Sequence, residues 1–445
     1  MKKYDASSFS KSDAHLERAH ALIPAGAHTY SKGDDCFPEH GPHYLVRGKG
    51  CRVWDLDGNE FIDMGMGLTS AGLGHAYGPV VERVRQALEL GVNYSLPHPM
   101  EVELAERIVG LYDGAEMVKL GKHGSDATTG AVKLARAFTG RDKVAFCKDQ
   151  PFFSTNDWFI GATACNAGIP ESTRNLICSF GYNDLPSLER LFTEHPGEIA
   201  CVILQPMEFD EPHPDFLLGV RNLCDEHGAL LIFDEVISGF RWHMKGAQHI
   251  FEVIPDFTCL GKTIANGFSV SALTGKRAYM ELGGTRHRGP KVFLLSTTHG
   301  GEIHGLAAAL ATMAEMEKHK VQDHMKEIGE YFIQGFNRLA EQQGIQEFCF
   351  ARGWGCRPLV ETRSHEGKGD LAYRTLFMQE MIYRGILIPQ VAPSFGMKKS
   401  DMDQVFEALH ETFGIYAQAL EAKDAGKFLD GRPIKAVFRK SNFED

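Results

Sequence analysis

The sequence predicts an α/β fold built on a mostly parallel, doubly wound sheet. Strand-like and helix-like segments alternate between residues 100 and 275, which is typical of βαβ units. Two apolar runs, 230–233 and 257–260, each end in polar residues, as buried strands of a parallel sheet do. Beyond residue 325 the pattern changes to mixed α and β segments. A chain of 445 residues is longer than one core usually carries, so we expect more than one domain.

The first hundred residues predict small elements around a long loop. Residues 15–24 read as a helix that Pro24 stops, and residues 25–41 form a loop rich in glycine, aspartate and aromatic residues. Alternating apolar residues around an Asp-Gly turn predict a hairpin over 51–62. A helix begins at Pro79, followed by another over 100–112. The inward face of the first of these helices is expected to hold Val80, Val81, Val84, Ala87 and Leu88.

Residues 117–144 predict a strand, a glycine turn and a helix. The expected inward face of that helix holds Ala131, Leu134, Ala135 and Phe138. A glycine turn that opens a helix offers backbone N–H groups and a positive dipole end to an anion, which makes Gly124 and Ser125 candidate ligands. An ordinary helix cap made by Ser125 or Asp126 is the alternative.

The remaining elements continue this alternation and then leave it. Strands are predicted over 143–147 and 200–204, and a helix over 216–227. Residues 296–302 are expected to follow a strand and open an alanine-rich helix over 303–318, which makes a second candidate anion cup; a cap by Thr298 is the alternative. Further segments are predicted to be helix 321–343, strand 346–352, helix 369–383, strand 385–388, helix 401–421 and a loosely packed polar tail from 423.

Composition excludes several classes of protein. Hydrophobic residues make up 43% and charged residues 24%, which is ordinary for a globular protein. A net charge of −11 argues against a protein that coats nucleic acid. We see no signal peptide, membrane-length apolar run or cluster of metal ligands. Ten scattered cysteines without a CxxC pair indicate reduced, mostly buried thiols and a cytoplasmic protein.

Asp234 and Lys262 carry the strongest chemical signal. They follow two consecutive predicted strands, 28 residues apart, and the carboxyl ends of such strands face the ligand crevice of an open α/β sheet. Pyridoxal phosphate needs a lysine for its aldehyde and an acid for its ring nitrogen. The alternative is that Asp234 and Glu235 cap a helix while Lys262 is a solvated side chain.

The two motifs FDEVISGFR and LGKTIANG resemble the signature of the class III aminotransferases, which are fold-type I pyridoxal phosphate enzymes. The surrounding chain, from about residue 20 to the last helix, is most similar to the glutamate-1-semialdehyde aminomutase branch. The resemblance implies that Lys262 is the Schiff-base lysine, that Asp234 pairs with the ring nitrogen, and that Val236 packs on one ring face. It also implies three parts, namely 1–72 as an N-terminal segment and part of the small domain, 73–325 as the large cofactor-binding domain, and 326–445 as the C-terminal small domain.

Other cofactor contacts are implied by the same resemblance. The family holds the phosphate in a Ser-Gly-Thr-Glu-Ala motif, and this chain has His123-Gly124-Ser125-Asp126-Ala127, in which the histidine is a departure of unknown meaning. Phe152 is expected to stack on the ring, with Phe153 as the alternative. Thr298 is expected to reach the phosphate of a neighbouring subunit, so the resemblance implies a homodimer with shared active sites. Glu302 occupies a position that is usually asparagine.

The expected activity is transfer of an amino group from a small-molecule donor to an aldehyde or ketone acceptor. An intramolecular aminomutase is the alternative within the family. Residues 386–404 contain no arginine, and Lys32 stands where the aminomutases carry the arginine that grips the substrate carboxylate. We therefore expect a sugar-like or phosphorylated carbonyl substrate in a pocket lined by His28, Tyr30 and Lys32, unless this loop is only a mobile surface segment.

Two other classes of protein fit less well. A binding protein without turnover would be expected to lack Lys262 or Asp234, and both are present. A nicotinamide-dependent dehydrogenase would need a strand-GxGxxG-helix unit, which the sequence does not offer.

Overall fold

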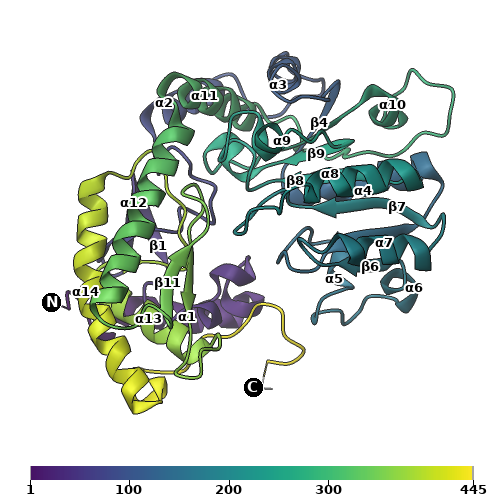
Figure 1. Cartoon of the computed structure of the whole chain (residues 1–445). Coiled ribbons are helices and arrows are strands. Elements are labelled where there is room, and N and C mark those ends of the chain that lie inside the picture. The colour runs from purple at the N-terminus through teal and green to yellow at the C-terminus, as the bar shows by residue number, and fades with distance from the viewer. Residues whose placement is uncertain (1, 443–445) are drawn as a thin grey trace. The chain divides into compact units, whose positions relative to one another are not determined.

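The computed structural model describes residues 2–442, which divide into two compact units (Figure 1). The small unit contains residues 2–77 and 323–439, and the large unit contains residues 78–322 with 440–442. No helix among the described residues is both long enough and apolar enough to cross a membrane.

The large unit is built on a seven-stranded sheet. Its strand order is β4 (Met117–Gly121), β10 (Ser271–Gly275), β9 (Phe257–Leu260), β8 (Leu230–Glu235), β7 (Ile199–Leu204), β5 (Lys143–Cys147) and β6 (Ile177–Phe180). The pairs from β9 to β6 are parallel, and β10 is antiparallel to both of its neighbours. The predicted fold class is therefore confirmed. Neither β6 nor β10 was predicted, and β10 has the sequence SALTG, which contains no run of large apolar residues.

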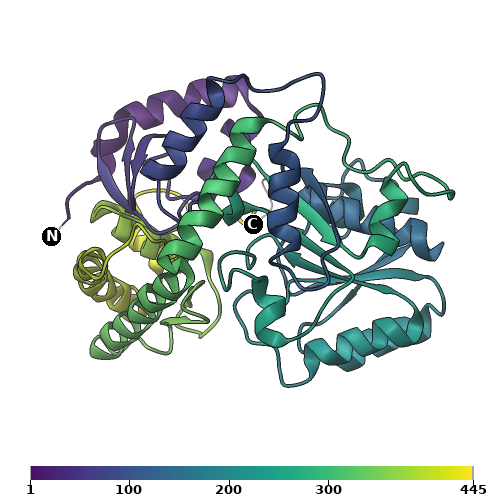
Figure 2. The same ribbon diagram turned by 90° about the horizontal axis from the view of Figure 1, so that it is seen from above.

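Helices cover both faces of this sheet (Figure 2). The chain crosses from β4 to β5 through α4 (Gly124–Thr139) and later returns strand by strand through α7 (Leu185–Glu194) and α8 (Phe216–His227). Because crossovers between parallel strands are right-handed, this reversal places α4 on one face and α7 and α8 on the other. All parallel strands consequently end at one edge.

Several helix faces differ from the prediction. In α2 (Gly78–Leu88), Val80, Val84 and Ala87 are buried, whereas Val81 and Leu88 are about half exposed. In α4, Phe138 is also about half exposed, with its ring edge-on to Tyr279 on the surface. These three residues were wrongly placed inside, because each lies at the margin of its helix's buried stripe and is at most partly covered by its neighbours.

Other segments of the large unit were also mispredicted. No strand precedes Ser296, since residues 284–302 are irregular in the structure. The remaining helices are α3 (Met100–Val109), α5 (Asp157–Ile160), α6 (Glu171–Arg174), α9 (Gly246–Phe251), α10 (Arg277–Met280) and α11 (Ile303–His319).

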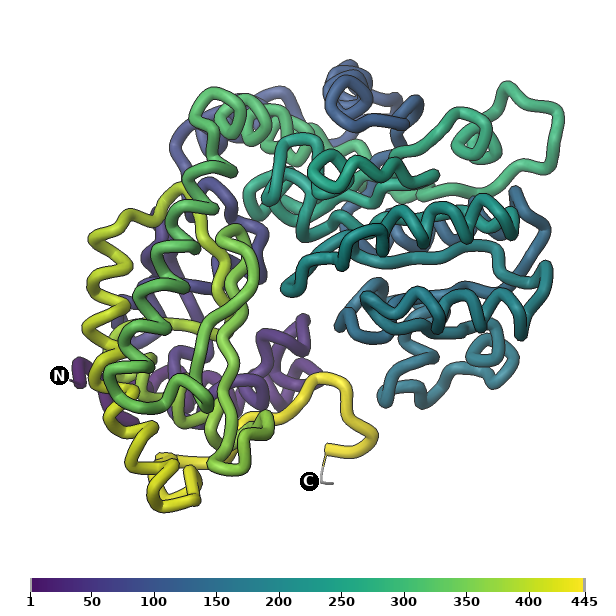
Figure 3. Tube along the Cα trace, in the orientation of Figure 1, coloured from purple at the N-terminus to yellow at the C-terminus, as the bar shows by residue number. Residues whose placement is uncertain are grey.

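The small unit joins the two ends of the chain in one sheet. Its strands lie in the order β1 (Leu45–Lys49), β2 (Arg52–Asp55), β3 (Glu60–Asp63) and β13 (Ile386–Leu387). The antiparallel pair of β2 and β3 confirms the predicted hairpin, β1, which was not predicted, is antiparallel to β2, and β13 is parallel to β3. Figure 3 shows the yellow-green C-terminal trace entering this purple N-terminal region.

Long helices cover this smaller sheet and enclose an aromatic core. They are α1 (Ser10–Leu22), α12 (Val321–Gln342), α13 (Leu371–Tyr383) and α14 (Lys399–Ala422), and a separate hairpin pairs β11 (Cys349–Arg352) with β12 (Leu359–Thr362). Phe332, Phe336 and Phe413 are fully buried at the centre of this core.

The C-terminal tail is not loosely packed as predicted. Residues 431–439, called the C-terminal strap below, are tied to the N-terminal loop. Arg432 pairs with Asp34 at 2.8 Å, and Arg439 pairs with Asp35 at 2.5 Å. The Lys435 amide also donates to the Asp35 carbonyl at 2.7 Å. The prediction failed because a polar segment can be ordered by charges far away in sequence.

Candidate active site

Sheet register brings the two predicted motifs together. In the parallel pair β8–β9, Asp234 lies beside Cys259 and Glu235 beside Leu260, so the next residues, Val236 and Gly261, leave the sheet side by side. A Cβ atom on Gly261 would lie 3.1 Å from a Val236 methyl group.

The start of α4 meets the same point. A Cβ atom on Gly124 would lie 2.8 Å from both methyl groups of Val236, which is closer than real contacts allow. Only glycine therefore fits here without a shift of its neighbours. The segments after β8, after β9 and before α4 converge at one end of the sheet, as the positions of these strands predicted.

Asp234 is a buried carboxyl group at this point. Its side chain accepts a hydrogen bond from the Val236 amide at 3.0 Å, and the residue is only 5% exposed. Burial raises the pKa of Asp234 to about 7, while the Val236 amide and the nearby Lys262 ammonium lower it. A cationic N–H group placed against Asp234 would stabilise its ionised form.

Lys262 begins a short 3-10 turn, Lys262–Ala265, directly after β9. Its φ of +43° is left-handed, a conformation that is uncommon for residues other than glycine and that is concentrated at functional sites. The residue is partly buried. Its ammonium group is close enough to Asp234 to lower the pKa of that carboxyl group.

Glu235 has a different role from its neighbour. It is fully buried and accepts hydrogen bonds from the amides of Ala247 at 2.6 Å and Gln248 at 3.0 Å, at the start of α9. The Ser238 hydroxyl donates to it as well, at 2.9 Å. The helix-cap alternative therefore holds for Glu235, which leaves Asp234 as the carboxylate available for chemistry.

The first turn of α4 forms a candidate anion cup. Asp126 caps the turn by accepting from the amides of Lys122 at 2.8 Å and His123 at 2.9 Å. The buried Ser125 hydroxyl accepts from the Thr155 amide at 3.0 Å, so its own proton is left to donate. Gly124 and Ser125 occupy the first helical positions, whose amide groups have no acceptor within a helix. The side chain of His123 is exposed, and we do not count it among the residues of the anion cup.

The two phenylalanines after β5 differ sharply in burial. Phe153 is 1% exposed, packs edge-on against Phe146 and Phe159, and its carbonyl accepts from the Thr128 hydroxyl at 2.8 Å. Phe152 is 40% exposed. Phe153 is thus a core residue, whereas Phe152, whose ring lies edge-on to Phe159, is the more exposed of the two.

Thr298 lies in the exposed segment before α11. Its carbonyl accepts from the Asn93 side chain at 3.0 Å, which connects this segment to the loop after α2. Glu302, four residues further on, forms an ion pair with Lys122 at 2.7 Å. Sequence reasoning missed Lys122, although its position immediately before the glycine turn was a usable signal. It also missed Glu208, a buried carboxylate close enough to raise the pKa of Asp234.

The predicted substrate residues lie in the small unit. Tyr30 and Lys32 are the ends of a 3-10 turn, Tyr30–Lys32, and His28 precedes it. Tyr30 is 66% exposed, and Lys32 is also exposed. The structure thus presents these side chains on a short ordered turn.

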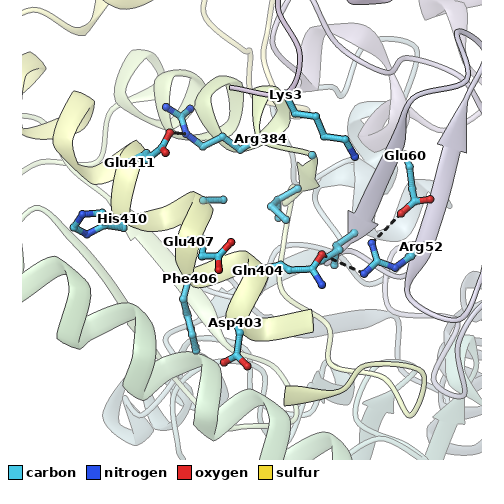
Figure 4. A pocket seen from close by; sticks show the side chains of 14 residues that line it. Lys3, Arg52, Glu60, Arg384, Asp403, Gln404, Phe406, Glu407, His410 and Glu411 are labelled. Carbon is cyan, nitrogen blue, oxygen red and sulfur yellow. Dashed lines mark hydrogen bonds and ion pairs between the residues drawn. The ribbon is translucent and has the colours of Figure 1, made fainter. Parts of the chain in front are cut away.

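A cavity of about 670 Å³ also lies in the small unit (Figure 4). Its arginines are already paired, Arg52 with Glu60 at 2.9 Å and Arg384 with Glu411 at 3.1 Å. None of the predicted site residues lines it. Because both of its arginines are neutralised by acids of the same cavity, we do not assign it a ligand.

Comparison with known families identifies the family of the chain. The family model described as aminotransferase class-III matches residues 38–413, most of the chain. The chain belongs to the class III aminotransferases. Its cofactor is accordingly pyridoxal 5'-phosphate, and it is an enzyme.

The sequences of two curated relatives align with nearly the whole chain of this aminotransferase. The glutamate-1-semialdehyde 2,1-aminomutase of Desulforamulus reducens is 31% identical, covering 93% of this chain and all of that protein. The protein of the same name from Syntrophobacter fumaroxidans is 32% identical, covering 91% and 97%.

Solved structures confirm the fold of this aminotransferase. The FumI protein of Sphingopyxis sp. MTA144 is 25% identical, with a TM-score of 0.85 over 94% of this chain and 100% of that one. A glutamate-1-semialdehyde aminomutase from Pseudomonas aeruginosa PAO1, 21% identical with a TM-score of 0.80 over 92% and 96%, shares the fold.

The residues at the strand ends fit the cofactor. A buried carboxylate whose pKa is raised by burial suits a cationic ring nitrogen, and a lysine lies near it. A helix start with a buried serine hydroxyl suits a phosphate group. The close packing of Gly124, Val236 and Gly261 brings these groups to one place.

Proposed function

We propose that Lys262 and Asp234 are the catalytic residues, and that the enzyme moves an amino group from a small-molecule donor to an aldehyde or ketone. The convergence of the segments after β8, after β9 and before α4 supports this proposal, because Asp234, Lys262 and the first turn of α4 belong to these segments. Pyridoxal phosphate, when bound, supplies the carbonyl carbon that takes up the amine and the ring that withdraws electrons.

Each residue of the site has a distinct task. Lys262 Nζ would hold the cofactor aldehyde and, once free, would remove and return the proton at the reacting carbon. Asp234 would accept a hydrogen bond from the ring N–H and keep that nitrogen cationic. One class of residues holds the cofactor without taking part in proton transfer. Val236 and Phe152 would pack on the two faces of the cofactor ring, and Gly124 and Ser125 would bind its phosphate. Thr298 would bind the phosphate of the cofactor in a second subunit.

Substrate choice is assigned to the exposed turn at Tyr30–Lys32. Lysine attracts an anion as a point charge, whereas the planar fork of arginine grips a carboxylate through two hydrogen bonds. A lysine at position 32 therefore favours a sugar-like or phosphorylated carbonyl compound, with His28 and Tyr30 as polar neighbours. The purified protein should be mixed with a panel of amine donors, and loss of the absorbance band of the resting cofactor identifies the donor.

An intramolecular aminomutase is the second candidate. It is supported by the relatives named glutamate-1-semialdehyde 2,1-aminomutase, which are 31% and 32% identical over more than nine-tenths of this chain. The two activities differ in what leaves the enzyme. A transaminase completes each half-reaction with separate donor and acceptor, whereas an aminomutase uses one molecule for both. Rapid conversion of glutamate-1-semialdehyde to 5-aminolevulinate would exclude the sugar-like or phosphorylated substrate.

A further inference from the structure

An ion pair joins the N-termini of α4 and α11. Lys122 immediately precedes the first turn of α4, and Glu302 is the last residue before α11. Their Nζ and Oε2 atoms are 2.7 Å apart, with side chains only 14% and 18% exposed. This pair is therefore shielded from water better than an ordinary surface pair, and its attraction is correspondingly stronger.

Both partners are held in place by further contacts. The Lys122 amide donates to Asp126 at 2.8 Å, and its carbonyl accepts from the Ser269 hydroxyl at 3.0 Å. Glu302 also meets His299 at 2.8 Å and, at 3.8 Å, the ring of His304. The hydrogen bond from Lys122 is the largest of the effects that lower the pKa of Glu302. The pair is thus a fixed connection between the two helices.

Electrostatics explains why this lysine needs its partner. The N-terminus of a helix carries a partial positive charge, so an ammonium beside the start of α4 is repelled unless an anion neutralises it. Glu302 supplies that anion and also lies favourably at the start of α11. With the pair intact, Lys122 stays where its amide, and that of His123, can bind Asp126 and hold the first turn of α4.

We propose that Lys122 and Glu302 are positioning residues for the cofactor phosphate. This inference rests on the proposed function, in which Gly124 and Ser125 bind the phosphate and Thr298 contributes to a second site. Lys122 lies two residues before Gly124, and Glu302 lies four residues after Thr298. The pair therefore holds two parts of the proposed sites in place. One is the first turn of α4, which binds the phosphate in its own subunit, and the other is the segment of Thr298, which reaches the site of the second subunit.

Cofactor binding tests the proposal directly. The cofactor-free full-length chain is titrated with pyridoxal phosphate and, separately, with pyridoxal, which lacks the phosphate. Lys122→Met and Glu302→Gln should each weaken binding of pyridoxal phosphate by roughly tenfold, within the range for loss of a close charge pair, and leave pyridoxal binding unchanged. The double variant should be no worse than either single variant, because one interaction is lost in all three.

Matched variants separate positioning from general damage. Lys143→Met removes a lysine of similar exposure, 17%, paired with Glu198 at the opposite end of the sheet strands, and should change neither affinity. Lys122→Arg and Glu302→Asp should keep most of the preference for the phosphate form. Thermal unfolding of each cofactor-free variant checks that the fold is retained.

Three results would overturn the inference. If Glu302→Gln tightened binding of pyridoxal phosphate while Lys122→Met weakened it, Lys122 would be a direct ligand for which Glu302 competes. If both variants lost affinity for pyridoxal as well, the pair would support the fold only. If wild type preferred the phosphate form and both variants kept that preference, the pair would be irrelevant to the cup. By contrast, a wild type that binds both probes equally would refute the proposed cup itself.

Discussion

Asp234 and Glu235 are adjacent, buried and both carry a carboxyl group, yet the structure gives them different surroundings. Glu235 is saturated by amide and hydroxyl donors at the start of α9, whereas Asp234 accepts one amide hydrogen bond and lies near a lysine. Alternation along a strand explains this, because successive side chains point to opposite faces. A role for one residue of such a pair therefore cannot be transferred to the other.

The first prediction at this scale concerns Lys262. Replacement by alanine removes the amine that both attaches the cofactor and moves the proton, so turnover should fall by roughly 10⁴-fold or more. Thermal unfolding and cofactor retention on gel filtration should show an intact protein. Transamination near the wild-type rate in Lys262→Ala would remove this residue from the mechanism.

The second prediction concerns Asp234 and pH. Burial raises its pKa from 3.8 to about 7, so the folded, cofactor-free chain binds this proton more tightly than the unfolded chain does. That contribution to stability is present at low pH and is lost as pH rises between about 4 and 7. Asp234→Asn cannot ionise and should therefore gain about 2 to 3 kcal/mol relative to wild type between pH 5 and pH 8.

Urea unfolding of both cofactor-free proteins at the two pH values measures this difference. Other groups titrate equally in the two proteins and cancel. The same variant should bind cofactor but lose most activity, since an amide cannot keep the ring nitrogen cationic. A stability difference independent of pH, or full activity, would contradict the assignment.

At the scale of elements, three chain segments meet at the point where strands β8 and β9 end and helix α4 begins. Gly124 of α4 lies against Val236, which follows β8, so tightly that a methyl group cannot enter. The helix start is consequently held in register with the sheet edge. A substitution at Gly124 should therefore displace Val236, and a substitution at Val236 should alter the packing of the first turn of α4.

Gly124→Ala should displace the first turn of α4 and weaken binding of pyridoxal phosphate by about tenfold or more, because an added methyl group that must force its neighbours apart costs about 1 to 3 kcal/mol. Combining it with Val236→Ala removes the methyl groups that collide and should recover part of the loss. Cofactor titration of the single and double variants measures this. Gly140→Ala, at the other end of the same helix, controls for the loss of a glycine; its added Cβ would meet nothing within 4 Å, although its left-handed φ makes that site strained too.

The C-terminal strap is the second element with a testable role. Arg439 and Arg432 hold Asp35 and Asp34, just beyond the turn that carries Tyr30 and Lys32. Arg439→Ala should loosen this loop, so that trypsin cleaves after Lys32 several-fold faster, while the free energy of unfolding changes by no more than about 1 kcal/mol. Lys427→Ala, which removes an exposed pair with Asp424 nearby, should leave the cleavage rate unaltered. Equal cleavage in all three proteins would show that the strap does not order the loop.

At the scale of the whole molecule, the large unit exposes several large apolar side chains to solvent. Around the loop after α2, Leu90 and Leu96 are 63% and 79% exposed, and Tyr94 is 44% exposed. This loop contacts the segment of Thr298, which we assign to a second subunit's site. Contiguous exposed apolar residues are typical of protein interfaces, so we predict an obligate two-fold dimer.

Leu96→Asp should place a charge in this interface and convert the dimer to an inactive monomer, as seen by sedimentation. The leucine is already exposed, so the folded monomer should lose little stability. Leu218→Asp, on the outer helix α8, is the matched control and should stay dimeric and active. An active monomer, in the wild type or in Leu96→Asp, would refute shared sites.

The sequence by itself determined the class of fold and predicted where the proposed site lies. The apolar runs before Asp234 and before Gly261 and Lys262 mark buried parallel strands, and parallel strands present their carboxyl ends at one edge, so the segments that carry these residues leave the sheet side by side. The same local logic predicted the N-terminal hairpin and the helix start at Gly124. Such features depend on patterns within a few residues of one another.

Only the tertiary structure decided the rest. It separated buried Phe153 from exposed Phe152, inserted the antiparallel strand β10, paired Lys122 with Glu302 and fastened the C-terminal strap to Asp34 and Asp35. Each of these depends on contacts between residues from tens to hundreds of positions apart. Local propensity and periodicity carry no information about such pairs, because burial and charge pairing are properties of the packed chain.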